Sequence, residues 1–176
     1  MDAVRKDMIP HGLGTLHPHL FDRLFSHKRY VFQIFNDVLG LCGIDHVAIT
    51  YINRKQEILA LSSTPALEFN LFKSQFWRFD QTYQARWYKQ CTSASWEMLY
   101  DKPHVDVLYY LKQIKPRYPF SFSLAHASAH GHMIYSLASH GETPHARQQF
   151  RTEQAHFYTI GDYCTQSLFP LLLDEA

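Results

Sequence analysis

The sequence predicts an α+β fold: an α-β-α sandwich in which a central antiparallel sheet carries helices on both faces. Two hairpin patterns supply the strands, one over residues 45–63 and one over residues 120–139. Apolar residues at helical spacing come before the first hairpin, fill the stretch between the two hairpins and follow the second. This order of elements indicates one layered domain, and we assign it to residues 19–174, with residues 1–18 as a flexible arm rich in Pro and Gly.

The second hairpin shows the strand pattern most clearly. Large apolar side chains alternate with small ones along its first strand, FSFSLA, so that Phe120, Phe122 and Leu124 share one face while Ser121, Ser123 and Ala125 share the other. The connection centred on Gly131 suits a tight turn, because glycine tolerates the positive φ that such loops need. Neither face is charged, which predicts a cover on both sides: a helix on one and a ligand cavity on the other.

Helices are predicted from apolar periodicity and from their end signals. The last one begins at Thr143-Pro144, runs to about Leu172 and carries a stripe containing Phe150 and Phe157 that covers one face of the sheet. A short strand or extended turn over residues 93–100 carries Trp96. The other predicted helices span residues 20–41, two short pieces within 66–91 that separate near 78–80, and residues 105–114.

Composition excludes several classes of protein. The chain has 176 residues, a net charge of +1 and no cluster of Lys or Arg, so it lacks the electrostatic signature of a DNA-binding domain. Its three cysteines have no CxxC spacing, which indicates reduced thiols. No signal-peptide core and no run long enough to span a membrane is present. We therefore expect a cytoplasmic protein with no membrane partner.

A family resemblance rests on four stretches within residues 20–172: ITYINRKQEILALSSTP, FWRFDQTYQARWY, FSFSLAHASAHGHMIYSLASH and QFRTEQAHFYTIGDYCTQSLFP. In these stretches and in its layout the chain resembles the N-terminal autoinducer-binding domain of LuxR-type transcription regulators, a GAF- and PAS-like sensory domain. It is similar to the orphan members of that family. The resemblance implies a small-molecule signal as ligand, a homodimer, and DNA binding only through a region outside this chain.

The sequence departs from the lactone-binding members of that family. They have a Trp that holds the lactone carbonyl, a Tyr four residues later that lines the site, and an Asp-Pro pair whose Asp accepts a hydrogen bond from the ligand amide. Here Phe79 stands four residues before Tyr83, where a Trp would be expected, and the segment Asp101–Pro103 is only an imperfect echo of Asp-Pro. Trp96 and Tyr100 also have the four-residue spacing, but Asp101 then follows immediately. These differences argue against a homoserine lactone as the ligand.

The candidate ligand-binding residues combine an apolar body with one hydrogen-bonding group, as small-molecule sites require. The aromatic segment Phe69–Trp96 is predicted to cover the small-residue face of the sheet and to enclose a buried pocket there. Plain core packing explains the same residues equally well. The candidates are Trp77, Tyr83, Trp87 and Trp96 from the aromatic segment, and Tyr51, Ser123, Tyr135 and Ser136 from the strands.

Metal and catalytic functions have weaker support. His126, His130 and His132 cluster around the hairpin connection, but no Cys or carboxylate completes a ligand set, and loop histidines are usually solvated. Motifs for a nucleophile elbow, a phosphate-binding glycine loop or a zinc-binding helix are missing. We therefore expect no cofactor, no metal and no enzyme activity. The main hypothesis is a LuxR-type sensory domain for a quorum-sensing-type signal, and the alternative is a GAF-like interaction module with a filled core.

Overall fold

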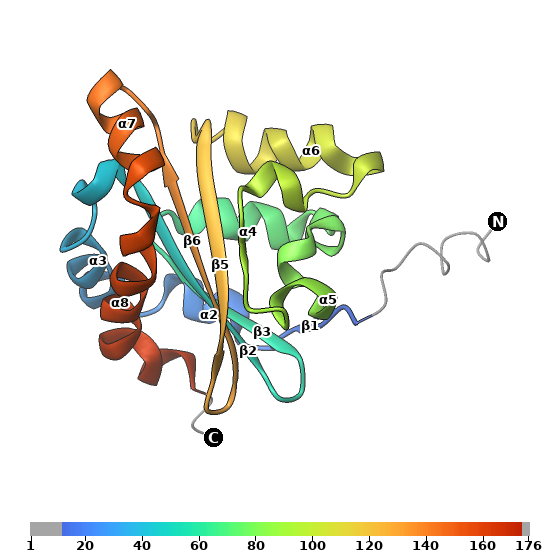
Figure 1. Ribbon diagram of the computed structural model, residues 1–176. Helices are drawn as coiled ribbons and strands as arrows, with labels where there is room; N and C mark the ends of the chain where they lie inside the picture. The colour runs from blue at the N-terminus through green and yellow to red at the C-terminus, as the bar shows by residue number, and fades with distance from the viewer. Residues whose placement is uncertain (1–11, 174–176) are drawn as a thin grey trace.

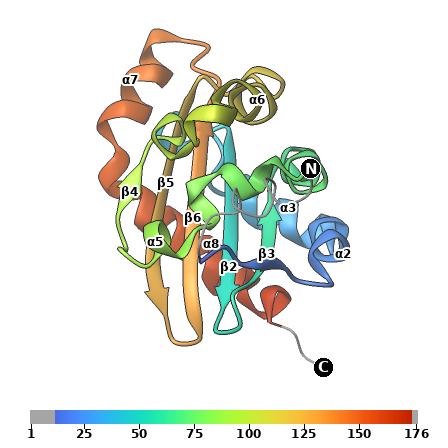
Figure 2. The same cartoon turned by 90° about the vertical axis from the view of Figure 1, so that its right-hand side faces the viewer.

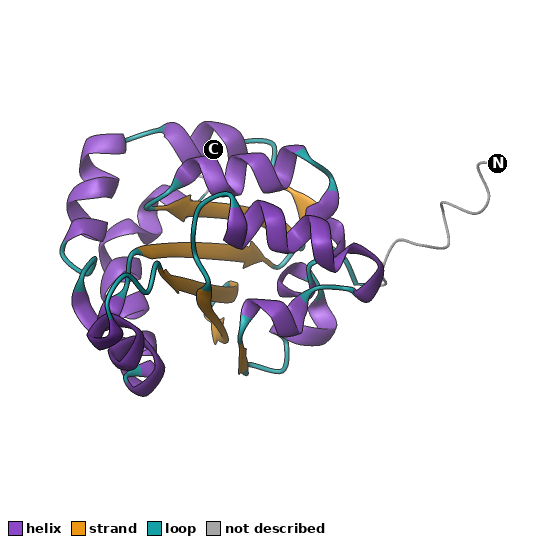
Figure 3. Cartoon of the chain, turned by 90° about the horizontal axis from the view of Figure 1, so that it is seen from above, coloured by secondary structure: helices purple, strands orange, loops and turns teal. Residues whose placement is uncertain are grey.

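The computed structural model describes residues 12–173, which form three layers around a central sheet (Figure 1). Helices lie on both sides of the strands when the molecule is seen from above (Figure 3). The strands are β1 (Thr15–Leu16), β2 (His46–Asn53), β3 (Glu57–Ser62), β4 (Ser93–Ala94), β5 (Phe120–Ser128) and β6 (Gly131–Ser139). The α-helices are α2 (Leu20–Phe25), α3 (Lys28–Asn36), α4 (Pro65–Lys73), α5 (Ala85–Tyr88), α6 (Val105–Tyr109), α7 (Pro144–Thr152) and α8 (Phe157–Leu172).

The sheet has the order β1-β3-β2-β6-β5-β4, and every neighbouring pair is antiparallel except β1 with β3 (Figure 2). Both predicted hairpins are confirmed as β2–β3 and β5–β6, and the second extends further than predicted, to Ser128. The two hairpins join through β2 and β6, where Ile49 lies opposite Tyr135. Seven of the eight residues of β2, next to the middle of the sheet, are buried.

One face of the sheet is covered by α3, α7 and α8, as the apolar stripe of the C-terminal region predicts. Phe150 and Phe157 are buried, with ring centres 5.0 Å apart, and Phe157 contacts Phe122 of β5. Gly161 allows the closest approach of α8, because a Cβ atom there would overlap the ring of Tyr135. A glycine inside this helix therefore sets how near the helix lies to the sheet.

The other face is covered by what we call the helical layer: α4, α5, α6 and the short turns that join them. These turns are the 3-10 segments Phe76–Phe79, Gln81–Tyr83, Trp96–Leu99 and Lys102–His104, and the π-helical turn Tyr110–Ile114 that continues α6. Short helices with few hydrogen bonds of their own depend on packing for their stability. The aromatic side chains of this region provide that packing.

Three predicted elements differ in the structure. The single helix expected over residues 20–41 is two helices, because the chain turns at His27, which has a positive φ of 53°. The long C-terminal helix is likewise divided at Glu153 into α7 and α8, with Thr143 capping α7 by accepting from the Ala146 N–H. Residues 12–18 of the expected arm take part in the fold, since β1 pairs with β3; residues 1–11 lie outside the described part of the chain.

Candidate ligand-binding site

The sheet face beneath the helical layer is lined by small side chains, as the alternation predicts. Trp96 packs against this face. Its indole Nε1 donates to Ser123 Oγ at 2.9 Å, and its backbone N–H donates to Ser121 Oγ at 3.2 Å. Ser123 Oγ is also 2.9 Å from Ser136 Oγ on the next strand. Two serines and one tryptophan therefore form a hydrogen-bonded chain across the strands.

An aromatic cluster also lies in the helical layer. Phe72 of α4, Trp77 and Tyr83 are all buried and meet edge-to-face, with ring centres 5.2 to 6.2 Å apart. Such arrangements are favourable for aromatic rings because the positive edge of one meets the negative face of another. Burial raises the pKa of the Tyr83 hydroxyl well above its ordinary value, and the carboxylates of Asp80 and Glu68 reinforce the shift.

A complete polar network, here called the Asp80 cluster, ties α6 to the rest of the layer. Lys112 Nζ lies 2.7 Å from Asp80 Oδ2, and Asp80 Oδ1 accepts from both the N–H and the hydroxyl of Thr82, at 3.0 and 2.6 Å. Tyr100 donates to Gln113 Oε1 at 2.7 Å, and Gln113 Nε2 donates to Glu97 at 2.8 Å. The Lys112 ammonium also lies 4.5 Å from the centre of the Trp96 ring.

A second polar group in the same layer is incomplete. His46, at the start of β2, and Glu68 of α4 are both buried, and His46 Nε2 lies 3.4 Å from Glu68 Oε1. That contact is close enough for an ion pair, but it lacks hydrogen-bond geometry, and both ring nitrogens of His46 are without a hydrogen-bond partner. The His46 ring is held edge-on to Trp96 and tilted against Tyr118, with centres 6.0 and 5.0 Å away.

Other buried polar atoms of the layer share this lack of partners. Native proteins leave few such atoms, since each costs about 1–3 kcal/mol, so a group of them requires an explanation. We call the following side chains the unpaired set; each is less than a tenth exposed and carries at least one buried polar atom that forms no hydrogen bond with any residue from 12 to 173: His46, Glu68, Trp77, Gln84 and Tyr88.

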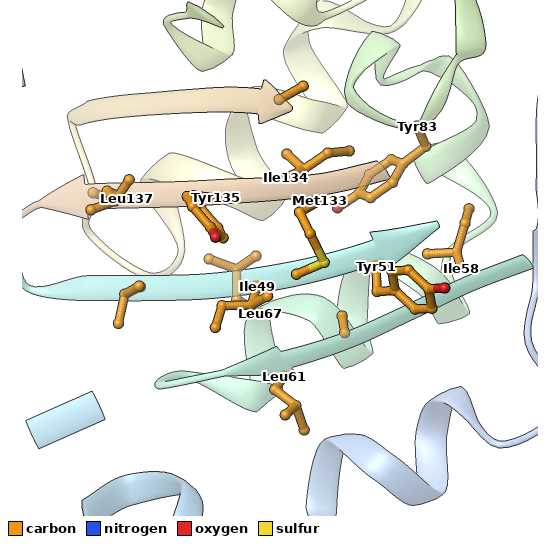
Figure 4. Packing of buried hydrophobic residues seen from close by; sticks show 14 of the residues in the cluster. Ile49, Tyr51, Ile58, Leu61, Leu67, Tyr83, Met133, Ile134, Tyr135 and Leu137 are labelled. Carbon is orange, nitrogen blue, oxygen red and sulfur yellow. The ribbon is translucent and has the colours of Figure 1, made fainter. Parts of the chain in front are cut away.

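The structure brings six of the eight predicted site residues to this side of the sheet. Trp77, Tyr83 and Trp87 come from the helical layer, and Trp96 joins Ser123 and Ser136 at the sheet. Figure 4 shows Tyr83 and Ile134 on one side of β6 and Tyr135 on the other.

Tyr51 and Tyr135 do not reach this site. Tyr135 accepts a hydrogen bond from Thr165 of α8, and Tyr51 contacts Phe169 of the same helix and donates to the His130 carbonyl. The reason is the period of a strand: Tyr135 precedes Ser136 and must point to the opposite face. Their grouping with the other six residues is corrected accordingly.

Sequence reasoning missed the charged residues of the layer. A signal was present for two of them, because Glu68 lies between the apolar residues Leu67 and Leu71 of α4, and Lys112 follows Leu108 at a helical interval. A charged residue on the buried stripe of a helix is rare unless it is paired, and it marks a polar site inside the core.

The histidines around the β5–β6 connection do not converge. His126 contacts Tyr135 and Tyr158 on the α8 side, whereas His132 lies against Tyr88 in the helical layer, so the two point to opposite faces. Across residues 12–173 no three His, Cys, Asp or Glu side chains lie close enough together to hold a metal ion.

Two surface hollows within residues 12–173 are lined by residues outside the unpaired set. One of about 290 Å³ is lined by Phe79, Asp101 and Lys102 at the rim of the helical layer. Another, about 500 Å³ and open to solvent, runs along the edge of β5 between Cys91 and Tyr158, on the α8 side. The unpaired atoms are instead covered by protein neighbours.

Comparison with known proteins identifies the fold. The structure is similar to that of the N-acylhomoserine lactone dependent LuxR-family transcription factor CepR2 of Burkholderia cenocepacia, with a TM-score of 0.60 and 13% sequence identity over 88% of this chain and 93% of that chain. It is also similar to SdiA of Escherichia coli, with a TM-score of 0.50 and 12% identity over 88% of this chain and 65% of that one. The chain has the fold of a LuxR-type autoinducer-binding domain.

The similarity to LuxR-type domains is found by comparing structures. No protein-family model matches the sequence, and no curated protein matches it. Within the part of the chain that the structure describes, no helix combines the length and apolar character needed to cross a bilayer.

Proposed function

We propose that this chain is the small-molecule-sensing domain of a LuxR-type transcription regulator. The observation that carries the proposal is the unpaired set: five buried side chains with open hydrogen-bonding atoms, one from strand β2 and four from the helical layer that covers this face of the sheet. A ligand with matching donors and acceptors would satisfy them, and the aromatic rings around them would supply the apolar surface that such sites have. The fold shared with CepR2 and SdiA supports the same function.

The Trp-to-Tyr spacing of the lactone-binding members is not reproduced in space. Phe79 stacks on His104, with ring centres 3.8 Å apart, at the outer rim of the layer. Trp77, two residues earlier, is the buried ring beside Tyr83, and its indole nitrogen has no partner. The Asp80 carboxylate is already occupied by Lys112 and Thr82. Both features favour a signal other than a homoserine lactone.

Ligand entry would require the helical layer to move, because protein atoms cover the unpaired set. The segments over it are short: α5 has 4 residues, and two 3-10 turns of 4 and 3 residues precede it. Segments with few hydrogen bonds open at low free-energy cost. Ligand binding would then stabilise the closed layer by mass action and shift the equilibrium of a cytoplasmic homodimer, which acts on DNA through a region outside this chain.

The test begins with protein purified under native conditions from its source organism. Native mass spectrometry should detect a bound small molecule, and adding that molecule to the apo chain should raise its melting temperature. Mobility-shift assays with the upstream DNA should show no sequence-selective binding by residues 1–176 alone. Tight, selective DNA binding by this chain would contradict the assignment of DNA binding to another region.

One observation favours a second candidate function, a GAF-like interaction module with a filled core. Leu71 and Phe72 have no exposed surface, and Trp96 and Tyr88 are each 1% exposed. Large side chains, most of them aromatic, therefore fill much of the layer. Such a module would act through protein contacts only. It would give no co-purifying molecule in the mass spectrum and no ligand-dependent rise in melting temperature.

A further inference from the structure

The carboxylate of Glu68 is buried with part of its hydrogen-bonding capacity unused. Its side chain is 5% exposed, Oε2 has no partner, and Oε1 faces His46 Nε2 at 3.4 Å without forming a hydrogen bond. A buried charge is stable only when it is paired and hydrogen-bonded. Within residues 12–173, His46 is the one residue that brings a nitrogen within ion-pair distance of this carboxylate.

A charged His46 does not complete the site. An imidazolium ring carries two N–H donors, whereas a neutral ring carries one. A proton on His46 Nε2 would face Glu68 Oε1 at 3.4 Å, but it would still leave Glu68 Oε2 without a donor. Within residues 12–173, Glu68 Oε2 therefore has unused hydrogen-bonding capacity that a donor on a ligand could fill.

The surroundings of Glu68 suit an ammonium group. Aromatic rings lie close to the contact between His46 and Glu68: the centre of the His46 ring is 5.0 Å from that of Tyr118 and 6.0 Å from that of Trp96. Ring faces attract cations within about 6 Å. The layer already holds one ammonium in this way, since Lys112 Nζ lies 2.7 Å from Asp80 and 4.5 Å from the Trp96 ring centre.

We propose that Glu68 is the residue that recognises the ligand, and that the ligand is a small, largely apolar amine whose ammonium group donates to Glu68 Oε2. The inference rests on the proposed sensor function. The aromatic cluster of Phe72, Trp77 and Tyr83 receives the apolar part of the ligand.

The experiment compares matched pairs of probes on the full chain. Phenethylamine, tryptamine and octylamine are each paired with the alcohol of the same skeleton, and binding is measured by calorimetry and by the shift in melting temperature. Each amine should bind roughly tenfold or more tightly than its alcohol, since a hydrogen bond to a charged group is worth that ratio. The variant Glu68→Gln keeps the shape of the side chain and should abolish the preference. Glu142→Gln, at an exposed carboxylate, should retain it.

The outcomes separate this inference from the sensor function. Equal binding of amines and alcohols, or an amine preference that survives Glu68→Gln or is lost in Glu142→Gln, would overturn the amine assignment. If neutral molecules alone stabilise both the parent and Glu68→Gln, the sensor function stands and the amine assignment falls. If no probe binds and native mass spectrometry finds no bound molecule, both proposals fail.

Discussion

Asp80 and Glu68 are two buried carboxylates in one helical layer, and their surroundings differ. Asp80 has a lysine at 2.7 Å and two hydrogen bonds from Thr82, whereas Glu68 has a histidine at 3.4 Å and one oxygen without any partner. A buried charge that is fully matched fixes the structure around it, and one that is partly matched destabilises the chain until something binds. The comparison separates a carboxylate whose hydrogen-bonding capacity is used within the layer from one whose capacity is partly unused.

The largest expected effect comes from removing the partner of Asp80. Lys112→Met should lower the free energy of unfolding by about 3–5 kcal/mol, because it leaves a buried carboxylate without a counter-ion. Urea unfolding measures the change. Lys115→Met, an exposed site one turn along the same segment, should leave stability within about 0.5 kcal/mol of the parent. Equal losses in the two variants would show that the Asp80 cluster does not hold the layer.

An intermediate effect is expected at the contact between Trp96 and the sheet. Ser123→Ala removes the acceptor of the Trp96 indole N–H and the partner of Ser136, and should cost about 1–3 kcal/mol of unfolding free energy. Ser93→Ala on the exposed strand β4 is the control and should be near neutral. A neutral result at Ser123 would mean that the indole finds another acceptor.

A small effect, in contrast to Lys112→Met, is expected for Glu68→Gln in the ligand-free chain. Replacing a poorly matched buried charge by a neutral amide of the same shape should change the unfolding free energy by less than about 1 kcal/mol, or stabilise the chain. The same urea titration measures it. A loss of about 3 kcal/mol or more would place Glu68 with Asp80 as a fully matched, structural carboxylate.

The smallest effect concerns pH. Burial beneath Tyr88 lowers the pKa of His132 below its ordinary 6.5, and the charge of Lys89 adds to the shift. As pH falls below 6.5, the unfolded chain takes up this proton before the folded chain does, so stability decreases; above 6.5 the effect is absent. His132→Gln should therefore reduce the loss of stability between about pH 7 and about pH 5.5. An unchanged slope, or an equal reduction in His145→Gln, would contradict this role.

The strands and their faces could be predicted from the sequence, because a strand alternates its side chains and the small residues Ser121, Ser123 and Ala125 mark one face. The same rule would have separated Tyr135 from Ser136, had it been applied to the candidate site. The helix breaks were less visible: the turn at His27 uses a positive φ, which a non-glycine residue rarely adopts. Nothing in the local sequence marks that position as a helix end.

The polar interior of the layer depends on contacts between distant residues. Lys112 reaches Asp80 across 32 positions, and His46 meets Glu68 from a different element. Buried charges at helical core positions indicate that partners exist, but the partner is chosen by tertiary packing. The π-helical turn over Tyr110–Ile114 is a second feature that the sequence does not reveal. In this turn the consecutive residues Lys112 and Gln113 are both buried in the layer.

The short parallel strand β1 has a mechanical consequence. The backbone N–H of Thr15 donates to the Gln56 carbonyl at the edge of the sheet. Three residues before Thr15, the carbonyl of Gly12 accepts a hydrogen bond from the backbone N–H of Ala85 in α5. Gly14 lies so close to Gln56 that a Cβ atom would collide with that carbonyl. Residues 12–15 are thus hydrogen-bonded to the sheet at one end and to the helical layer at the other. A movement of α5 away from the sheet would therefore pull on residues 12–15, which connect the helical layer to the edge of the sheet.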